Sequence, residues 1–401
     1  MSTHPMDRRD FLKNTVAGGV GLGMLGAAGG AQAAQGPAPG GKVPRRQLGA
    51  TGADVPILLM GGTQKFDDRY DKTLHRAFEL GVDYIDTARE YAQGQAQKTI
   101  GTFMKQVGDR KKMWVTSKAT LVGADATPEG FRTGVDQCLE GLETDYLDMF
   151  FMHMITDERL FGPDFIRTSE ELKKAGKIRF FGFSCHDGNS AELMAAAAKM
   201  GGGVDAIMFR YNFREYGDVA LNKAIDACKA AGIGLIAMKT QASVPADLDA
   251  VVEFRSQDFT LGQAKLKAVW ADERIDAAVS AMTNVNLVTE NTAAAMSPVK
   301  LSMNEFMQLN RLAALTAHAH CLGCKQRCEP RANGLRIADT LRYLMYHECY
   351  GETDEARALY RALPRKARDF KAIDLSEATA ACPQGIRIAE RLAQARHVLT
   401  A

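Results

Sequence analysis

The sequence predicts an α/β protein in which eight parallel strands, each followed by a helix, close into a (β/α)8 barrel, and a smaller, mainly helical domain follows. Three observations support this fold. Short apolar runs recur between residues 55 and 282, and stretches with the period of an amphipathic helix separate them. The side chains best suited to chemistry come at the ends of such runs, where barrels of this type place their reacting groups.

The apolar runs have the composition and the bounding turn residues of short buried strands. They cover residues 55–62, 83–88, 113–118, 146–153, 178–185, 206–212, 232–239 and 275–282. Between them, residues 127–142 and 218–232 show clear helical spacing of apolar side chains. This repeated strand–helix order indicates parallel βα units that close on themselves.

Four polar residues stand at the carboxyl ends of three of these strands. Asp86 and Tyr91 follow the second run, Lys118 closes the third and His153 closes the fourth. A free tyrosine has a pKa of about 10 and is a poor acid near neutrality. A neighbouring ammonium stabilises phenolate and lowers that pKa, and Asp86 can hold the lysine in place. We therefore predict a proton-donating site, against the alternative of ordinary polar residues at strand ends.

Several segments of the barrel resemble the aldo/keto reductases, in the same order along residues 46–296. They read RQLGATGADVPILLMGG, DTAREY, WVTSK, GLETDYLDMFFMH and GIGLIAMK. The resemblance implies an oxidoreductase in which Tyr91 is the general acid on a carbonyl oxygen, tuned by Lys118 and Asp86. It implies that His153 orients the carbonyl and stabilises the developing oxyanion, and that hydride comes from NADP(H) or NAD(H).

The residues that this family uses around the nicotinamide differ here. Gly62 and Thr63, after the first strand, are expected to face the same pocket. Relatives hold the carboxamide with a Ser-Asn pair after the fifth strand and a Gln in the sixth. This sequence keeps Ser184 but has Cys185 in place of Asn, and Met208 stands where the Gln is expected. The clamp on the nicotinamide is therefore expected to be weakened.

The phosphate-binding stretch after the last strand matches the family in part. Asn284, Glu290 and Asn291 fit the pattern, but no Lys or Arg lies between Ala281 and Asn291. A 2′-phosphate is usually bound by a cation, so strong selectivity for NADP is not expected. Either the cofactor binds through altered contacts, or electrons arrive by another route.

The terminal domain carries a C-x2-C-x3-C motif and a later Cys-Pro pair. The cysteines concerned are Cys321, Cys324, Cys328 and Cys382. The same region contains a short internal repeat, in which residues 333–341 (NGLRIADTL) match residues 384–392 (QGIRIAERL) at an offset of 385 − 334 = 51. The first three cysteines have no counterparts in the second copy.

This pattern resembles a two-cluster ferredoxin reduced to a single cluster. In such ferredoxins each cubane takes three thiolates from one motif and its fourth, the Cys before Pro, from the other. The resemblance implies that Cys321, Cys324, Cys328 and Cys382 hold one [4Fe–4S] cluster. Zinc on four cysteines and a disulfide or free thiols remain the alternatives.

The amino terminus has the pattern of an export signal. Paired arginines, Arg8 and Arg9, precede a Gly- and Ala-rich apolar run that ends in an A-x-A site at residues 31–33. This is typical of twin-arginine signals, and the run is too short and Gly-rich for a lasting membrane anchor. We expect the twin-arginine translocase to export the folded protein to the periplasm; a cytosolic protein with a disordered basic tail is the alternative.

The expected organisation is therefore a signal peptide over residues 1–33, a linker over 34–44, the barrel over 45–300 and an iron–sulfur domain over 301–401. Lys plus Arg total 50 against 48 for Asp plus Glu, so no nucleic-acid partner is expected. The leading hypothesis is an exported carbonyl or alcohol oxidoreductase, with a small-molecule substrate and a redox partner. The alternative is an iron–sulfur electron-transfer or structural protein whose barrel has lost nicotinamide chemistry.

Overall fold

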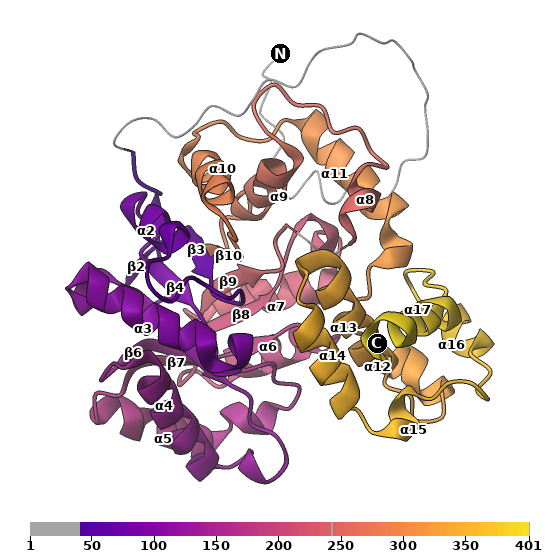
Figure 1. Ribbon diagram of the computed structural model, residues 1–401, viewed down its shortest axis with the longest axis horizontal. Helices are drawn as coiled ribbons and strands as arrows, with labels where there is room; N and C mark the ends of the chain where they lie inside the picture. The colour runs from indigo at the N-terminus through magenta and orange to yellow at the C-terminus, as the bar shows by residue number, and fades with distance from the viewer. Residues whose placement is uncertain (1–40, 242–243, 401) are drawn as a thin grey trace.

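The computed structural model describes residues 41–241 and 244–400, and its centre is a closed barrel of eight parallel strands (Figure 1). Around the barrel the order is β10-β3-β4-β5-β6-β7-β8-β9. The strands are β3 (Leu58–Gly61), β4 (Tyr84–Asp86), β5 (Trp114–Ala119), β6 (Leu147–Met152), β7 (Ile178–Cys185), β8 (Ala206–Arg210), β9 (Gly234–Met238) and β10 (Ala277–Ser280). Seven lie within the apolar runs and β5 extends one residue beyond its run, so the barrel prediction is confirmed.

Helices cover the outside of the barrel and continue beyond it. The α-helices are α2 (Lys72–Glu79), α3 (Gln95–Val107), α4 (Pro128–Leu142), α5 (Pro163–Lys174), α6 (Ser190–Lys199), α7 (Val219–Ala230), α8 (Ala246–Asp249), α9 (Leu261–Trp270), α10 (Val285–Met296), α11 (Met303–Leu315), α12 (Lys325–Cys328), α13 (Ile337–Tyr350), α14 (Thr353–Ala362), α15 (Arg365–Arg368), α16 (Ser376–Ala380) and α17 (Ile388–Thr400). Single 3-10 turns are η1 (Tyr91–Gly94), η2 (Arg110–Lys112), η3 (Gly123–Asp125), η4 (Glu158–Phe161), η5 (Phe213–Glu215), η6 (Ala317–Ala319) and η7 (Glu329–Arg331).

The two helices expected from periodicity, α4 and α7, start one residue later than the periodic pattern because that residue is a cap. The Thr127 hydroxyl accepts a hydrogen bond from the amide of Gly130 at 3.1 Å. The Asp218 carboxylate accepts one from the amide of Leu221 at 2.9 Å. Each cap satisfies an amide that the first helical turn leaves without a partner.

Strand alternation divides the barrel side chains into two layers. One set fills the interior, including Leu59, Met149 and Met208. The other faces the surrounding helices, including Phe183 and Cys185. Because neighbouring side chains of a strand point to opposite faces, Ser184 lies on the interior side of β7 while Cys185 lies on the helix side.

A two-stranded hairpin, which the sequence reading did not separate from the first strand, closes the amino-terminal end of the barrel. It pairs β1 (Arg45–Gln47) with β2 (Asp54–Pro56). Its turn places fully buried Leu48 among the interior residues. Gly49 has φ +52°, and a Cβ there would lie 2.3 Å from the amide nitrogen of Gly234. The turn therefore requires glycine both for its backbone and for its close approach to the sheet.

Helix α11 belongs to the barrel by its packing, although the sequence placed it in the terminal domain. Its Leu309 and Leu312 are buried in the layer between strands and helices. A separate apolar core begins beyond it, with Cys328, Ile337 and Leu341 among its members. We call residues 317–400 the terminal module; within this described range it contains helices and no strand. Among the described residues of the whole chain, no helix is long and apolar enough to cross a membrane.

The internal repeat has a structural counterpart in the terminal module. Gly334 (φ +83°) and Gly385 (φ +64°) form equivalent left-handed turns. Helices α13 and α17 follow them and begin at Ile337 and Ile388, which are 388 − 337 = 51 residues apart. Helices α12 and α16 also begin 376 − 325 = 51 residues apart. The two halves of the module are therefore copies of one turn–helix unit.

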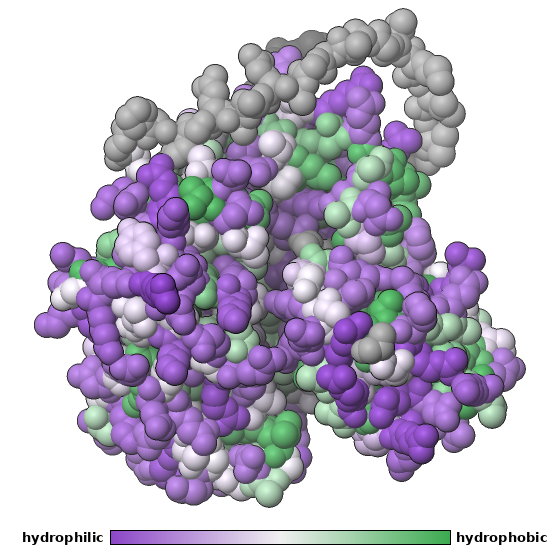
Figure 2. All heavy atoms as spheres, in the orientation of Figure 1, coloured by the Kyte–Doolittle hydropathy of each residue, from purple (hydrophilic) through white to green (hydrophobic). Residues whose placement is uncertain are grey.

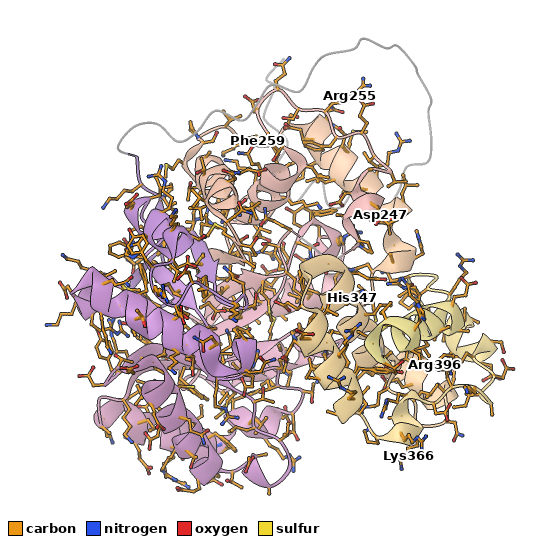
Figure 3. The ribbon with its side chains drawn as sticks, viewed as in Figure 1. Asp247, Arg255, Phe259, His347, Lys366 and Arg396 are labelled. Atoms are coloured by element: carbon orange, nitrogen blue, oxygen red, sulfur yellow. The ribbon has the colours of Figure 1, made fainter. Side chains whose placement is uncertain are left out.

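The terminal module lies against the barrel through α13 and α14, while α15, α16 and α17 lie further out (Figure 1). The outer face of the molecule is largely hydrophilic and is hollowed along the line where the two parts meet (Figure 2). Side chains fill the space between the barrel ribbon and α13, near the labelled His347 (Figure 3). This places the module beside the loops at the carboxyl ends of the strands.

Candidate active site

Lys118 and Asp86 form a buried ion pair at the carboxyl ends of β5 and β4. Their side chains are only 1% and 5% exposed. The Lys118 ammonium donates to Asp86 Oδ2 at 2.7 Å and to the carbonyl oxygen of Thr87 at 2.8 Å. Burial lowers the pKa of Lys118 and raises the pKa of Asp86, while their contact favours the charged pair. The pair is thus held rigidly beneath the barrel mouth.

Tyr91 lies directly over this pair. Its ring centroid is 4.9 Å from the Lys118 ammonium, so the cation faces the ring. Ala92 and Gln93, with φ of +47° and +53°, turn the chain sharply after Tyr91. Burial raises the pKa of Tyr91 well above 10, and the charge of Asp86 adds to the rise. The expected lowering by Lys118 is therefore not found: Asp86 offsets the ammonium, and the phenol is covered.

His153 completes the group of four from the end of β6. Its ring lies edge-on to that of Tyr91, with centroids 5.6 Å apart. His153 Nδ1 is 3.3 Å from the Thr120 hydroxyl and 3.5 Å from Glu90 Oε2. Burial lowers the pKa of His153, which favours the neutral imidazole. The structure thus brings all four predicted residues together at the carboxyl ends of the strands.

The three residues expected to hold the nicotinamide carboxamide, Ser184, Cys185 and Met208, do not all face the barrel interior. The Ser184 hydroxyl accepts a hydrogen bond from the amide of Met154 at 2.9 Å. Met208 is buried in the barrel interior. Cys185 lies on the helix side of the sheet, and burial raises the pKa of its thiol to about 12. Only Ser184 therefore presents a polar group on the interior side.

The first barrel loop contacts the terminal module. A Cβ at Gly62 would lie 2.9 Å from the carbonyl oxygen of Asp86, so the loop runs close to the catalytic strand ends. The Thr63 side chain hydrogen-bonds the carboxylate of Glu352, from the turn between α13 and α14. Burial raises the pKa of Glu352. Thr63 is thus bound within the protein by a residue that the sequence reading did not single out.

The three residues of the phosphate-binding pattern all make contacts within the barrel. Asn284 caps α10 by accepting from the amide of Leu287 at 3.0 Å. Glu290 accepts a hydrogen bond from the Thr260 hydroxyl. Asn291 is buried and accepts from Gln241 Nε2 at 3.1 Å. Their polar groups are engaged in holding α10 against the barrel.

Aromatic side chains of α13 lie over the barrel mouth. Lys239, directly after β9, has its ammonium 4.6 Å from the ring centroid of Tyr346 and 5.2 Å from that of Tyr350. Tyr346 and Glu352 also raise the pKa of Tyr91. The sequence reading quoted Lys239 within GIGLIAMK without assigning it a role, and its position at a strand end was the signal available.

Four cysteine side chains line one small cavity in the terminal module, which we call the thiol cavity. They are Cys321, Cys324, Cys328 and Cys382. Ile337 and Ile388, the equivalent first residues of α13 and α17, form part of its wall. Burial raises the pKa of Cys328 to about 12. Among the described residues, no group of three or more His, Cys, Asp or Glu is placed to hold a metal ion.

The loop that carries these cysteines is attached to the barrel. The amide of Gly188, after β7, donates to the carbonyl oxygen of Gly323 at 3.0 Å. Arg210, at the end of β8, donates to the carbonyl oxygens of Cys321 and Leu322. The cysteine loop is therefore held by hydrogen bonds from the barrel at the ends of β7 and β8, beside the expected cofactor site.

An ion-pair network fixes the same contact. Asp187 Oδ1 lies 2.5 Å from Arg342 of α13, and Asp187 Oδ2 lies 2.8 Å from Lys325 of α12. Both cations also contact Asp339, at 2.8 and 3.1 Å. These buried pairs hold two helices of the module against the loop after β7.

The barrel matches known proteins. Residues 59–244 match the model of the Aldo/keto reductase family. L-galactose dehydrogenase of Arabidopsis thaliana is 26% identical over 298 residues, which cover 66% of this chain and 92% of that protein. The uncharacterized oxidoreductase YqkF of Bacillus subtilis is 30% identical over 153 residues, 35% of this chain and 48% of that protein.

Solved structures show the same fold. Aldo-keto reductase AKR11C1 of Bacillus halodurans, in its holo form, aligns with a TM-score of 0.55 at 21% identity, covering 67% of this chain and 96% of that one. An aldo-keto reductase of Klebsiella pneumoniae in complex with NADPH aligns with a TM-score of 0.52 at 22% identity, covering 68% and 95%. The comparisons indicate an oxidoreductase whose barrel is similar to the aldo/keto reductases, and the match to the family model ends before the terminal module.

Proposed function

We propose that the chain is an exported oxidoreductase that acts on a small carbonyl or alcohol substrate at Tyr91 and carries one [4Fe–4S] cluster in its terminal module. One observation carries this proposal. Helix α13 lies with Ile337 and Leu341 against the thiol cavity and with Tyr346 and Tyr350 over the barrel mouth. Helix α13 therefore connects the cysteines to the barrel site.

The four cysteines fit a cluster in ligand type and line one cavity, although they do not form a preassembled ligand group among the described residues. Thiolates are the ligands of [4Fe–4S] centres, and here all four line one cavity with apolar walls. The Gly323 amide donates to Cys321 Sγ at 3.4 Å, the type of contact that tunes such centres. Cys321, Cys324, Cys328 and Cys382 would hold the cluster, which when bound supplies one-electron redox chemistry.

The repeat explains why one cluster is proposed rather than two. At the offset of 51, Ile386 and Leu341 of the thiol cavity correspond to Leu335 and Leu392. Those two counterparts line a second space that holds Tyr360 and Phe370 instead of cysteines. The second copy has therefore exchanged ligands for aromatic packing.

In the barrel, this chain's residues handle the proton. A carbonyl oxygen placed between Tyr91 and His153 would accept a hydrogen bond from the phenol. With a nicotinamide bound as the hydride donor to the carbonyl carbon, the phenolic proton would pass to the oxygen as negative charge develops on it. A high pKa keeps Tyr91 protonated until that moment. The Lys118–Asp86 pair lies 4.9 Å behind the ring and stabilises the phenolate that remains.

The mouth lacks the contacts that the resemblance implies for a nicotinamide carboxamide. Ser184 is engaged by Met154, Met208 and Cys185 offer no amide, and Tyr346 and Tyr350 lie over Lys239. This favours a second candidate, an iron–sulfur electron-transfer or structural protein whose barrel has lost nicotinamide chemistry. Titration with NADPH and NADH, followed by cofactor fluorescence, separates the two, because saturable binding supports the reductase.

A metal and sulfide analysis and a comparison of turnover test the proposal. Iron and acid-labile sulfide are measured in protein purified without air; four of each per chain support the cluster, and stoichiometric zinc without sulfide contradicts it. Turnover of the Tyr91→Phe protein is compared with Tyr70→Phe, an exposed tyrosine outside the pocket. We expect turnover to fall by at least about 100-fold only at Tyr91; full activity of that variant overturns its role.

The proposed export depends on residues that lie outside the described part of the chain. Arg8 and Arg9 are expected to direct the folded protein to the periplasm through the twin-arginine translocase. This route suits a protein whose cluster is inserted before export. A variant with Arg8→Lys and Arg9→Lys should accumulate in the cytoplasm, as measured by fractionation. Equal periplasmic amounts of the variant and the unchanged protein argue against this route.

A further inference from the structure

Lys239 has an unusual backbone for a lysine. It follows β9 directly and has φ +56°, in the left-handed region that residues with a Cβ seldom adopt. Such strain persists where the surrounding structure fixes it and is concentrated at functional sites. Here it directs the side chain beneath the rings of Tyr346 and Tyr350.

The side chain lines a largely enclosed cavity between the barrel and the terminal module, which we call the mouth cavity. Its wall includes His186, Arg210, Lys239, Cys321, Arg342 and Arg391. Cys321 also lines the thiol cavity, so the two cavities share a wall. The wall thus carries Arg210, Lys239, Arg342 and Arg391 against one carboxylate, that of Asp187, and the cavity adjoins the thiol cavity.

Lys239 is the cation of this cavity whose charge is not matched. The guanidinium groups have carboxylate partners: Arg210 with Glu215 at 3.3 Å, Arg342 with Asp187 at 2.5 Å and Arg391 with Glu348 at 2.6 Å. Over residues 41–241 and 244–400, by contrast, the contacts of the Lys239 ammonium are those with the two tyrosine rings, and it forms no ion pair. Lys239 is partly buried, and a partly buried ammonium is less favourable without an anion.

The surroundings explain why the protein itself supplies no counter-charge. The groups that act on Lys239 are Arg210 of β8, Arg342, Tyr346, Cys349 and Tyr350 of α13, and Glu352 of the following turn. Glu352 favours the ammonium, but its carboxylate is bound by Thr63. Burial and the charge of Arg342 lower the pKa of Lys239 to about 7. An arriving anion would restore the ammonium.

We propose that the mouth cavity is a carboxylate subsite, in which Lys239 binds the acid group of a small oxo- or hydroxycarboxylic acid whose reacting carbon faces Tyr91. This names the substrate class of the proposed function and rests on it. The geometry links the two ends of such a substrate, because Tyr346 stacks on Lys239 and also acts on Tyr91. The guanidinium groups around the cavity exclude cationic substrates and favour anionic ones.

Calorimetric titration of the full holoprotein with pyruvate, 2-oxoglutarate and phenylpyruvate tests the subsite, with methyl pyruvate as the uncharged comparison. We expect at least one acid to bind saturably and the ester to bind at least about tenfold more weakly. Lys239→Met should lose that binding and Lys239→Arg should retain it. The matched control is Lys267→Met, because Lys267 is a half-buried lysine of α9 that donates to the carbonyl oxygen of Ser297 at 2.8 Å; its binding should be unchanged.

The pH dependence gives a second readout. Above pH 7 the affinity should fall towards tenfold per pH unit in the unchanged protein, because binding requires the ammonium, and this slope should be absent in Lys239→Arg. Equal affinity of the unchanged protein and Lys239→Met, or no saturable binding of any acid, overturns the subsite.

A further arm identifies the source of the anion. Inorganic pyrophosphate stands in for the diphosphate of a dinucleotide, and tighter, Lys239-dependent binding of pyrophosphate than of any acid also overturns the proposal. Binding is measured without turnover. If the protein binds an acid but shows no turnover, the subsite is supported and the proposed activity is contradicted. If turnover depends on Tyr91 but Lys239→Met binds the acid as well as the unchanged protein, the activity is supported and the subsite is contradicted.

Discussion

The buried pair of Lys118 and Asp86 offers the sharpest test of the site, because each charge is almost fully removed from water and depends on the other. Lys118→Met and Asp86→Asn each remove one charge at nearly constant volume. Breaking a buried pair from one side leaves the other charge unmatched and destabilises a protein by about 3–5 kcal/mol. With 1% and 5% exposure, these side chains belong to the fully buried case.

The assay follows barrel unfolding in guanidinium chloride by tryptophan fluorescence. The chain has two tryptophans, and both, Trp114 of β5 and Trp270 of α9, lie in the barrel. Taking a denaturant slope of about 4 kcal/mol/M, each single variant should lower the midpoint by about 1 M. The double variant should fall short of the summed losses by at least about 2 kcal/mol, because it leaves no orphan charge.

The stability of the double variant can also contradict the proposed interaction. If the double variant loses as much stability as the two single variants together, the charges do not interact and the proposed support for Tyr91 is absent. Turnover adds a separate comparison, since the double variant should regain stability but not activity. Lys105→Met serves as the control, because Lys105 pairs with Glu143 at the surface, where ion pairs contribute about 0–1 kcal/mol.

Three further predictions follow from other parts of the structure. Gly49→Ala should destabilise the barrel by several kcal/mol or prevent folding, since its Cβ would meet the backbone of Gly234 at 2.3 Å; Gly108→Ala, with positive φ but open space around it, is the comparison in thermal unfolding. Burial lowers the pKa of His186 to about 3, so unfolding free energy should fall by about 1.4 kcal/mol per pH unit as pH drops below about 6.5 towards 3, where the unfolded state binds the extra proton; His186→Asn should reduce that slope in acid titrations. Cys382→Ser should lose bound iron and visible absorbance while Cys349→Ser, outside the thiol cavity, retains both; equal iron in the two proteins contradicts the assigned ligands.

The barrel could be predicted because its information is local. Each strand is a short apolar run and each helix has its own period, so both are visible in a single window of sequence. The positions of Asp86, Lys118 and His153 followed from the rule that parallel strands bring their carboxyl ends together. The β1–β2 hairpin was merged with the first strand because its strands are only three residues each and lack alternation.

The contacts between the parts could not be predicted, because they join residues far apart in the chain. Arg210 and Cys321 are 111 residues apart, and Arg342 and Asp187 are 155 apart. No pattern within the module shows that α13 ends over Lys239. The predicted lowering of the Tyr91 pKa failed because burial and the charge of Asp86 outweigh Lys118, and the charges of Tyr346 and Glu352, which no local pattern placed there, add to the rise.

These contacts make the terminal module part of the barrel site. Tyr346 and Glu352 raise the pKa of Tyr91, Glu352 binds Thr63, and Tyr346 stacks on Lys239, so each element of the mouth is set by a residue of the module. Cys321 is held by Arg210 of β8 at the other end. A change in the cysteine loop that moves α13 is therefore expected to change the pKa of Tyr91 and the contact between Lys239 and Tyr346. The proposed proton donor and the proposed cluster site are thus linked through α13, because its Leu341 lines the thiol cavity and its Tyr346 raises the pKa of Tyr91.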